Sequence, residues 1–328
     1  MVKKFQIRFI LVFVLLGGAI AFLVGKASTP QLPSARSPLV FYANQSRQDL
    51  KLLFCEAIRS AKKSLHVCFY GITDRDIIAA LGKKAQDGIA LEITYDPTAS
   101  LPLRSLFPSS AALKAHNKRG LMHRKILSID NAYLLLGSAN LTPSSLRYHS
   151  NLILGLYSPD LAGFIEKRSS SQYQLIIEDQ KIECYLLPDA QKQALERLLA
   201  LIAGAQKSIR IAMFTFTHPQ IAQALIAAHQ RGVSVSVILD SYSGRGASRK
   251  TFEALKAAGI RTALSQGQQL LHHKWAIVDE EQWIMGSANW TKAAFAKNED
   301  FLLILSTLTK EQIQFLNRLW STLEIEAA

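Results

Sequence analysis

The stretch from His123 to Asn140 decides the fold, and its sequence is His-Arg-Lys-Ile-Leu-Ser-Ile-Asp-Asn-Ala-Tyr-Leu-Leu-Leu-Gly-Ser-Ala-Asn. A second copy, from His272 to Asn289, is His-His-Lys-Trp-Ala-Ile-Val-Asp-Glu-Glu-Gln-Trp-Ile-Met-Gly-Ser-Ala-Asn. In both copies His-x-Lys is followed after four residues by Asp, and after six more by Gly-Ser-Ala-Asn. Because the identities and the gaps recur together, coincidence is the weakest explanation.

The likeness of the two copies extends upstream into a longer internal repeat. Residues 57–96 align without a gap with residues 201–240. Each copy has an apolar run typical of a strand, then a helical pattern closed by glycine, then a second apolar run. Strand, helix and strand in this order predict a parallel pair joined by a right-handed crossover. The predicted strands are 65–70, 90–95, 209–216 and 233–239, and the predicted helices are 76–86 and 220–230.

The repeat predicts an α/β fold of two duplicated sandwich halves. Further strands are expected at 39–42 and 182–187, each followed by an amphipathic helix, at 47–60 and 190–203. We expect mixed, largely parallel sheets that pack about a pseudo-twofold axis, which would bring equivalent positions to one seam. The polar stretch 158–180 marks the boundary. The halves are therefore placed at 36–167 and 181–325.

The N-terminal segment, residues 1–27, has the pattern of a membrane anchor. Lys3, Lys4 and Arg8 precede an uncharged stretch from Phe9 to Gly25. Its length lies between a signal-peptide apolar region and a full bilayer span. Because the apolar run continues past the cleavage-like Ala19-Ile20-Ala21, we favour a single-pass anchor with the catalytic body on the exported side. A secreted or periplasmic protein, released by signal cleavage, is the alternative.

The composition excludes several classes. Hydrophobic residues make up 49% of the chain and charged residues 19%, so a disordered chain is excluded, and three cysteines are too few for a disulfide scaffold. The 38 Lys+Arg exceed the 25 Asp+Glu by 13. This excess indicates an anionic partner, either nucleic acid or anionic lipid, and charge alone does not separate the two.

The two motifs carry the chemistry. On a strand, alternate side chains share a face, so each His lies beside its Lys, and each motif Ser has the same relation to its Asn. Two imidazoles flanked by cations and amide donors suit in-line displacement at a phosphodiester. One His attacks phosphorus and the other protonates the leaving oxygen, while the cations and amides stabilise the developing charge. The predicted catalytic residues are His123, Lys125, His272, Lys274, Asn140 and Asn289.

The remaining motif residues are expected to support this set. Asp130 and Asp279 are predicted to bind neighbouring backbone amides, and Ser138 and Ser287 to share the catalytic surface. A zinc site at His272-His273 is disfavoured, because no Cys or carboxylate stands at ligand spacing beside it. The scheme needs no metal and no cofactor.

The two motifs resemble the signature of the phospholipase D superfamily, His-x-Lys-x4-Asp-x6-Gly-Ser-x-Asn. The segment 286–300 is most similar to the branch of small bacterial endonucleases and mitochondrial cardiolipin hydrolases. Members of that branch carry one motif and dimerise, so this chain resembles a fused dimer, and one chain would suffice for a complete site. The resemblance implies a phosphohistidine mechanism with His123 as nucleophile and His272 as acid and base.

One departure from the family pattern bears on these roles. In the family, an acidic residue fourteen positions after the motif glycine orients the histidine of its own motif. Asp300 occupies this position after Gly286, but Asn151 occupies it after Gly137. An amide does not stabilise an imidazolium by charge. On this reasoning His272 would be the better nucleophile and the two roles would be exchanged.

The leading hypothesis from the sequence is a metal-independent, membrane-tethered phosphodiesterase that hydrolyses phospholipid headgroup esters. The alternatives are an endonuclease acting on nucleic acid, a phosphatidyltransferase resembling cardiolipin synthases, and a noncatalytic phosphate-binding module. The expected partners are therefore a phospholipid substrate and a membrane, with nucleic acid as the alternative.

Overall fold

A computed structural model describes residues 29–328 except 169, 190 and 268. Leu32–Ala328 form one compact unit. The anchor predicted at 1–27 lies outside the described residues. Within the described part, no helix is both long and apolar enough to cross a membrane.

The first half of the compact unit is a sheet with the strand order β1-β7-β6-β5-β2-β3-β4. Its strands are β1 (Leu39–Ala43), β2 (Ser64–Phe69), β3 (Ala90–Tyr95), β4 (Ala112–Ala115), β5 (Lys125–Ile129), β6 (Tyr133–Gly137) and β7 (Leu152–Tyr157). Its helices are α2 (Leu50–Ser60), α3 (Arg75–Gln86), α4 (Pro143–Arg147) and α5 (Pro159–Lys167), with 3₁₀ turns η1 (Asn44–Ser46) and η2 (Leu103–Ser105).

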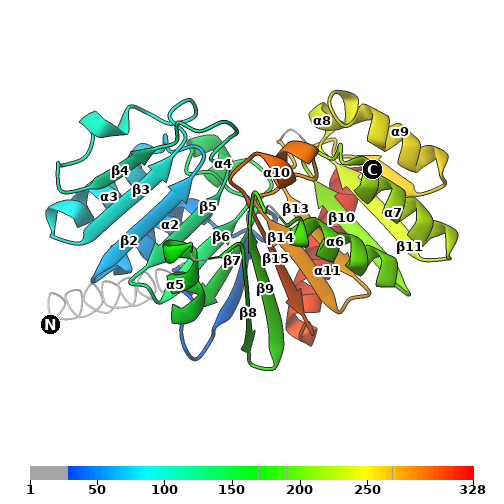
Figure 1. Ribbon diagram of the computed structural model, residues 1–328, viewed down its shortest axis with the longest axis horizontal. Helices are drawn as coiled ribbons and strands as arrows, with labels where there is room; N and C mark the ends of the chain where they lie inside the picture. The colour runs from blue at the N-terminus through cyan, green and yellow to red at the C-terminus, as the bar shows by residue number, and fades with distance from the viewer. Residues whose placement is uncertain (1–28, 169, 190, 268) are drawn as a thin grey trace, which may run out of the picture. The chain divides into compact units, whose positions relative to one another are not determined.

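The second half repeats this plan with additions, in the strand order β12-β11-β10-β13-β14-β15-β9-β8 (Figure 1). Its strands are β8 (Gln172–Ile177), β9 (Gln180–Leu186), β10 (Ser208–Met213), β11 (Ser234–Leu239), β12 (Arg261–Leu264), β13 (Lys274–Val278), β14 (Gln282–Gly286) and β15 (Phe301–Ser306). Its helices are α6 (Gln193–Gly204), α7 (Pro219–Gln230), α8 (Ser241–Arg245), α9 (Arg249–Ala257), α10 (Lys292–Ala296) and α11 (Lys310–Glu326).

The predicted parallel crossovers are present, since β2 pairs in parallel with β3 and β10 with β11. The expectation of largely parallel sheets is wrong, however. In the first sheet every neighbouring pair from β2 through β5, β6 and β7 to β1 is antiparallel. The second sheet has the same arrangement from β10 through β13, β14 and β15 to β9. The reason is the short turn inside each motif, because strands joined by three residues form a hairpin.

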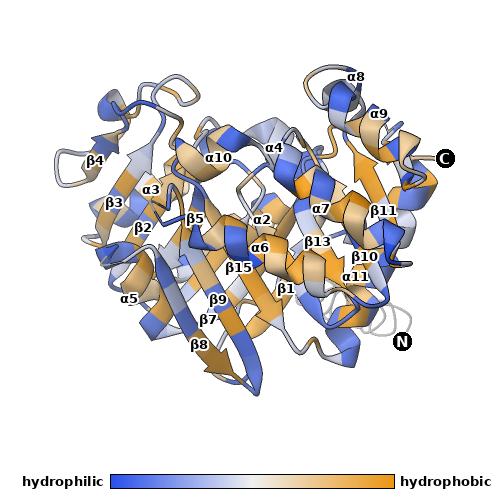
Figure 2. Ribbon diagram, turned by 45° about the vertical axis from the view of Figure 1, so that its right-hand side comes forward, coloured by the Kyte–Doolittle hydropathy of each residue, from blue (hydrophilic) through white to orange (hydrophobic). Residues whose placement is uncertain are grey.

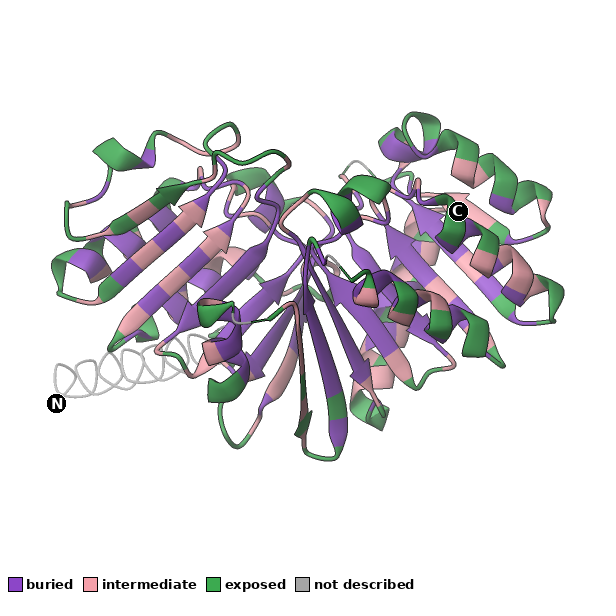
Figure 3. Ribbon diagram, viewed as in Figure 1, coloured by how far each residue is buried: buried purple, intermediate pink, exposed green. Residues whose placement is uncertain are grey.

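The two sheets pack face to face, as the duplication predicts. The core between them combines apolar side chains of both sheets, among them Ile126 and Leu154 from one and Trp275, Trp283 and Leu303 from the other. On the outer faces, α2 and α3 cover the first sheet and α6 and α7 the second. Because both faces of the central strands are covered, β5 and β13 are buried along their whole length (Figure 3).

The boundary predicted within 158–180 stays a prediction, but that stretch has structure of its own. Ser158 caps α5 by accepting from the Leu161 amide, and β8 joins the second sheet beside β9. In Figure 2 the β8–β9 hairpin points away from the edge that carries α8, α10 and α4. The histidine and asparagine ends of the two motif hairpins lie at the edge that carries α4, α8 and α10.

Candidate active site

The two motif histidines are held at the seam by backbone pairing between the halves. The His123 amide donates to the Glu299 carbonyl at 2.8 Å, and the His272 amide donates to the Ser150 carbonyl at 3.0 Å. Each histidine segment is thus paired with the other half, at the point where its own strand begins. Both histidines are 8% exposed. The structure therefore brings together the two motifs that the sequence predicted to converge.

Each imidazole is oriented by a side chain of the opposite half. His123 Nδ1 lies 2.7 Å from Asp300 Oδ1, and His272 Nδ1 lies 3.1 Å from Asn151 Oδ1. The expectation that Asp300 orients the histidine of its own motif is therefore wrong. The pairing crosses the seam because the residue before Asp300 pairs with the residue before His123, and the residue before Asn151 pairs with the residue before His272. The carboxylate consequently lies behind His123, and the argument for exchanged roles fails.

The motif serines stand behind these orienting residues. Ser287 Oγ donates to Asp300 Oδ1 at 2.7 Å, and Ser138 Oγ donates to Asn151 Oδ1 at 2.8 Å. Each hydroxyl also accepts a backbone amide, from Phe301 and Leu152 respectively. The expectation that the serines share the catalytic surface with the asparagines is corrected, because these bonds turn them toward the residues that fix the imidazoles.

The motif glycines allow the strands to approach closely at this point. A Cβ at Gly137 would collide with the Leu152 carbonyl oxygen, and one at Gly286 with the Phe301 carbonyl oxygen. These carbonyls also accept the amides of Ser138 and Ser287. Glycine in each Gly-Ser-x-Asn segment is thus required by backbone contact with the strand that carries the orienting residue.

Both motif lysines are buried, and the charge of Lys125 acts on Lys274. Lys125 Nζ donates to the His123 carbonyl at 2.6 Å and Lys274 Nζ to the His272 carbonyl at 2.8 Å. Burial lowers the pKa of Lys125 to about 7. Burial and the Lys125 charge hold the pKa of Lys274 well below its usual range. Positive charges that are buried near each other are stabilised by a bound anion.

The histidines share this electrostatic environment. Burial has the largest effect on the pKa of His123 and lowers it. The charge of Lys125 lowers this pKa further, while Asp300 raises it. Burial and then Lys274, Lys125 and His123 hold the pKa of His272 well below its usual range. The pKa of Asp300 is lowered, mainly by His123, although its burial acts in the other direction. Asp300 is therefore ionised, and both imidazoles are neutral before an anion binds.

The asparagines complete the ring of donors. Asn289 Oδ1 accepts the Thr215 amide at 3.3 Å, which leaves its amide nitrogen available. Asn140 is fixed through its backbone amide, which donates to Ser145 Oγ at 2.9 Å. In the described part of the chain, the buried Asn140 Oδ1 has no hydrogen-bond partner. The contact of these two side chains with a phosphoryl group stays a prediction.

The motif aspartates are structural, as expected. Asp130 accepts the backbone amides of residues 62–64, and Asp279 accepts those of residues 206–208. Both aspartates have a positive φ of 56°, a conformation that Asp tolerates in turns. Each carboxylate thus connects the motif hairpin to the start of β2 or β10, far along the strand from the histidines.

Two aromatic residues at the site were missed in the sequence. The Tyr70 ring centroid lies 5.3 Å from that of His123, with Lys125 Nζ 5.4 Å from the Tyr70 ring. Phe214 stands in the same relation to His272, at 5.0 Å, and to Lys274, at 4.9 Å. The signal was present in the repeat, because Tyr70 and Phe214 are equivalent positions after β2 and β10.

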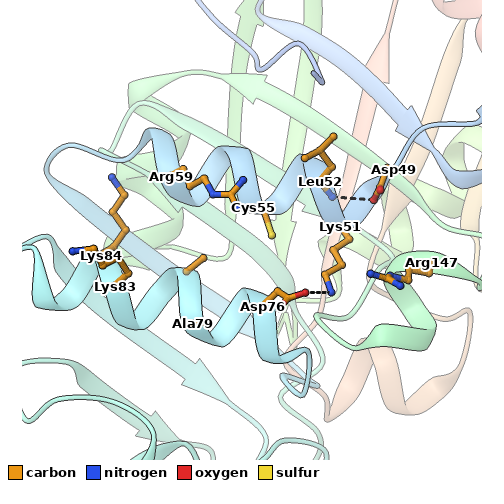
Figure 4. A pocket seen from close by; sticks show the side chains of 11 residues that line it. Asp49, Lys51, Leu52, Cys55, Arg59, Asp76, Ala79, Lys83, Lys84 and Arg147 are labelled. Carbon is orange, nitrogen blue, oxygen red and sulfur yellow. Dashed lines mark hydrogen bonds and ion pairs between the residues drawn. The ribbon is translucent and has the colours of Figure 1, made fainter. Parts of the chain in front are cut away.

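The neighbours of the first motif have separate locations. The His149 ring lies 6.1 Å from that of His272, and burial lowers the pKa of His149. Arg147 instead lines a polar pocket between α2 and α3, together with Lys51 and Asp76 (Figure 4). Lys51 is engaged by Asp76 at 2.6 Å and Asp74 at 3.1 Å, so this pocket is separate from the catalytic seam.

His273, which follows the motif histidine of the second copy, is a core residue. Its side chain is fully buried against Trp275, and neither ring nitrogen has a partner among the described residues. No group of three or more His, Cys, Asp or Glu that would hold a metal ion occurs in the described ranges. Burial lowers the pKa of His273 to about 3.

We expect His273 to make folding sensitive to acid. The pKa of His273 in the folded state is depressed below the unfolded value of about 6.5. Its contribution to the free energy of unfolding is therefore fully present above that pH. The contribution is lost as the pH falls from about 6.5 toward 3, by up to roughly 1.4 kcal/mol per pH unit. Denaturant unfolding of His273→Phe across this range should show a smaller loss of stability on acidification than the parent chain. Equal slopes for both proteins would contradict the prediction.

The comparisons with known proteins agree with the geometry. The family described as "Cardiolipin synthase, PLD-like domain" matches residues 54–191 and 198–320. The mitochondrial cardiolipin hydrolase of Xenopus laevis is 36% identical over 129 residues, which cover 39% of this chain and 61% of that protein. A phospholipase D of Rickettsia typhi is 26% identical over 146 residues, covering 41% of this chain and 71% of that protein.

The fold has a solved counterpart. The phosphatidylserine synthase of Haemophilus influenzae Rd KW20 superposes with a TM-score of 0.72 and 14% identity, covering 91% of this chain and 88% of that one. The chain spans about three fifths of the length of the Xenopus cardiolipin hydrolase, so the activity of that whole protein is not transferred by the likeness. The match to the family covers most of the sequence and contains both motifs, and the chain therefore belongs to the phospholipase D superfamily.

Proposed function

We propose that this protein is a metal-independent phosphodiesterase that hydrolyses phospholipid headgroup esters through a phosphohistidine intermediate. The observation that carries the proposal is that two oriented imidazoles are buried together with Lys125 and Lys274, and that only the imidazole of His123 has a carboxylate partner. A phosphodiester supplies the single negative charge that this site lacks. The likeness to cardiolipin hydrolases and a phospholipase D favours a lipid as the ester.

In the first step, His123 Nε2 attacks phosphorus while its Nδ1 proton remains directed at Asp300. The P–N bond forms and the P–O bond to the headgroup alcohol breaks. The negative charge of the bound diester raises the pKa of His272, so that its Nε2 takes up a proton from solvent and then donates this proton to the leaving oxygen. Lys125, Lys274 and the Asn140 and Asn289 amides stabilise the charge on the nonbridging oxygens.

In the second step, water attacks phosphorus. Its proton passes to His272, the P–N bond breaks, and phosphatidate leaves with His123 neutral again. Asp300 supports both steps, because the imidazole carries positive charge while it is joined to phosphorus. An alcohol in place of water would give transfer of the phosphatidyl group by the same sequence of events.

The test is turnover by the full chain in excess chelator, with cardiolipin or headgroup-labelled phospholipid in vesicles and, separately, with single-stranded DNA and RNA. We expect lipid headgroup release that survives the chelator. Turnover of nucleic acid alone would replace the proposal with an endonuclease, and formation of a new diester from added alcohol would replace it with a transferase. Turnover of none of these substrates would leave a phosphate-binding module.

A further inference from the structure

Four segments border the edge of the sheets at which the two histidines lie. They are 97–121, which follows β3 and leads to His123; 141–150, which holds α4; 241–251, which holds α8; and 290–298, which holds α10. Asp96 and Asp240 fix two of them to the site, since they accept the amides of Met122 and Leu271 directly before the histidines. We call these four segments the rim. In Figure 1 the helices of these segments, α4, α8 and α10, lie near the upper edge of the compact unit.

The rim is cationic and contains no acidic residue. No Asp or Glu occurs in any of its segments, although the chain has 25 such residues. Several rim cations are solvent-exposed and have no ion-pair partner among the described residues: Arg104, Arg119, Arg245, Lys250, Lys292 and Lys297. Lys114 and Lys118 lie near Glu92 and Glu299, and Arg249 lies 3.9 Å from Glu253. The charge is therefore largely uncompensated at this edge.

The rim also carries exposed apolar side chains. Tyr242 is 80% exposed and Tyr148 is 57% exposed, and Leu106 and Leu121 are exposed as well. The other large hydrophobic side chains exposed in the described residues are Ile176 and Ile325, on β8 and α11. Exposed leucines and tyrosines among unpaired cations are the composition that binds the boundary of an anionic bilayer, where tyrosine lies at the headgroup level. Leucine has no ring on which a base would stack.

We propose that the rim docks on the surface of an anionic membrane and presents the His123–His272 seam to the headgroup layer. The inference rests on the proposed phospholipid hydrolysis and adds the orientation in which the lipid is reached. Charge complementarity brings the rim to the bilayer, the exposed Tyr and Leu side chains enter its boundary, and the buried site below receives a headgroup without extraction of the whole lipid. The β8–β9 hairpin then faces away from the membrane (Figure 2).

The test uses the full chain with single tryptophan reporters, because the native Trp275, Trp283, Trp290 and Trp320 are buried. Tyr242→Trp and Tyr148→Trp place an indole on the rim, and Ile176→Trp and Ile325→Trp are matched controls at exposed positions elsewhere. Vesicles of phosphatidylcholine and phosphatidylglycerol carry bromine in the acyl chains to quench nearby indoles. We expect quenching of both rim reporters and not of the controls. Equal quenching at all four positions, or none on the rim, would overturn the proposal.

A charge-matched pair of variants tests the electrostatic part. Arg119→Gln, Arg245→Gln and Lys297→Gln together remove three rim charges, and Lys63→Gln, Lys207→Gln and Lys310→Gln remove three exposed charges at the opposite strand ends. Each lost rim charge should weaken docking roughly fivefold, so the rim triple variant should lose quenching and vesicle turnover by on the order of a hundredfold at about 0.15 M salt. The control triple variant should retain both. Equal effects in the two triple variants would contradict the proposal.

The same preparations separate this inference from the proposed function. Turnover of a soluble phosphodiester, measured in parallel, reports the catalytic site without a membrane. Rim quenching without any lipid turnover would uphold the docking surface and refute the proposed activity. Lipid turnover without rim-specific quenching would uphold the proposed activity and refute the docking surface. Displacement of the vesicles from the rim reporters by a single-stranded oligonucleotide, with unchanged turnover of nucleic acid and none of lipid, would assign the rim to nucleic acid and overturn the proposal.

Discussion

His123→Ala is expected to abolish turnover, with a loss on the order of 10⁴ to 10⁶ in kcat, and to leave no covalent adduct. The reason is that His123 is the imidazole held by an ionised carboxylate, at 2.7 Å from Asp300, and is thus the one best able to carry positive charge while bonded to phosphorus. Without it, water would have to attack the diester directly, with only the lysines and amides to assist.

His272→Ala should behave differently, and the contrast assigns the roles. With a nitrophenyl phosphodiester the leaving oxygen needs no proton, so the first step should still occur in this variant. The second step should stall, because no base remains to take the proton from water. Base-quenched samples analysed by mass spectrometry should therefore show a phosphorylated peptide containing His123. An adduct on His272 in the parent chain, or one that persists in His123→Ala, would refute this assignment.

Asp300→Asn should reduce kcat by roughly 10² to 10³. An amide oxygen is able to accept from an imidazole Nδ1, since Asn151 does so for His272, so the tautomer of His123 should be retained. The loss should therefore be smaller than the roughly 10⁴ seen when a triad aspartate is replaced and the tautomer is wrong. What is lost is the negative charge that stabilises the phosphorylated imidazole. The bond from Ser287 should remain, because an amide oxygen accepts from a serine in the other half, where Ser138 donates to Asn151. Single-turnover kinetics should place the loss in formation of the adduct.

Asn151→Asp is the reciprocal change and should act through the pH profile. His272 must be protonated to serve as acid, so the rate falls as the pH rises through its pKa. A carboxylate beside it favours the imidazolium and raises that pKa, which should move the alkaline limb to higher pH by about one to two units. Thermal unfolding is the control, because the Asn151 amide also donates to the Ser145 carbonyl at 2.8 Å and the variant loses that bond. An unmoved alkaline limb in a folded variant would show that His272 is not the acid.

Local pattern was sufficient for much of the fold. The repeat at constant offset located β2, α3 and β3 and their counterparts β10, α7 and β11 to within a few residues, because an amphipathic helix between two apolar strands is specified by nearby sequence. Strand direction beyond these crossovers was predicted wrongly, because the sheets were expected to be largely parallel. The motif segments form antiparallel hairpins, because the turns at Asp130 and Asp279 are short. From the sequence these two aspartates were predicted only to bind neighbouring backbone amides.

Motif spacing is enough to predict the candidate catalytic residues, since it places an imidazole beside an ammonium in each motif and the duplication supplies two such pairs. Which histidine has the carboxylate follows only from how the two halves pair. Asp300 and His123 are 177 positions apart, and Asn151 and His272 are 121 apart. Motif spacing records neighbours along one strand, whereas these pairs are set by which segments of the two halves hydrogen-bond across the seam. The physical reason is that the packing of two sheets, and not proximity in the chain, fixes contacts over such separations.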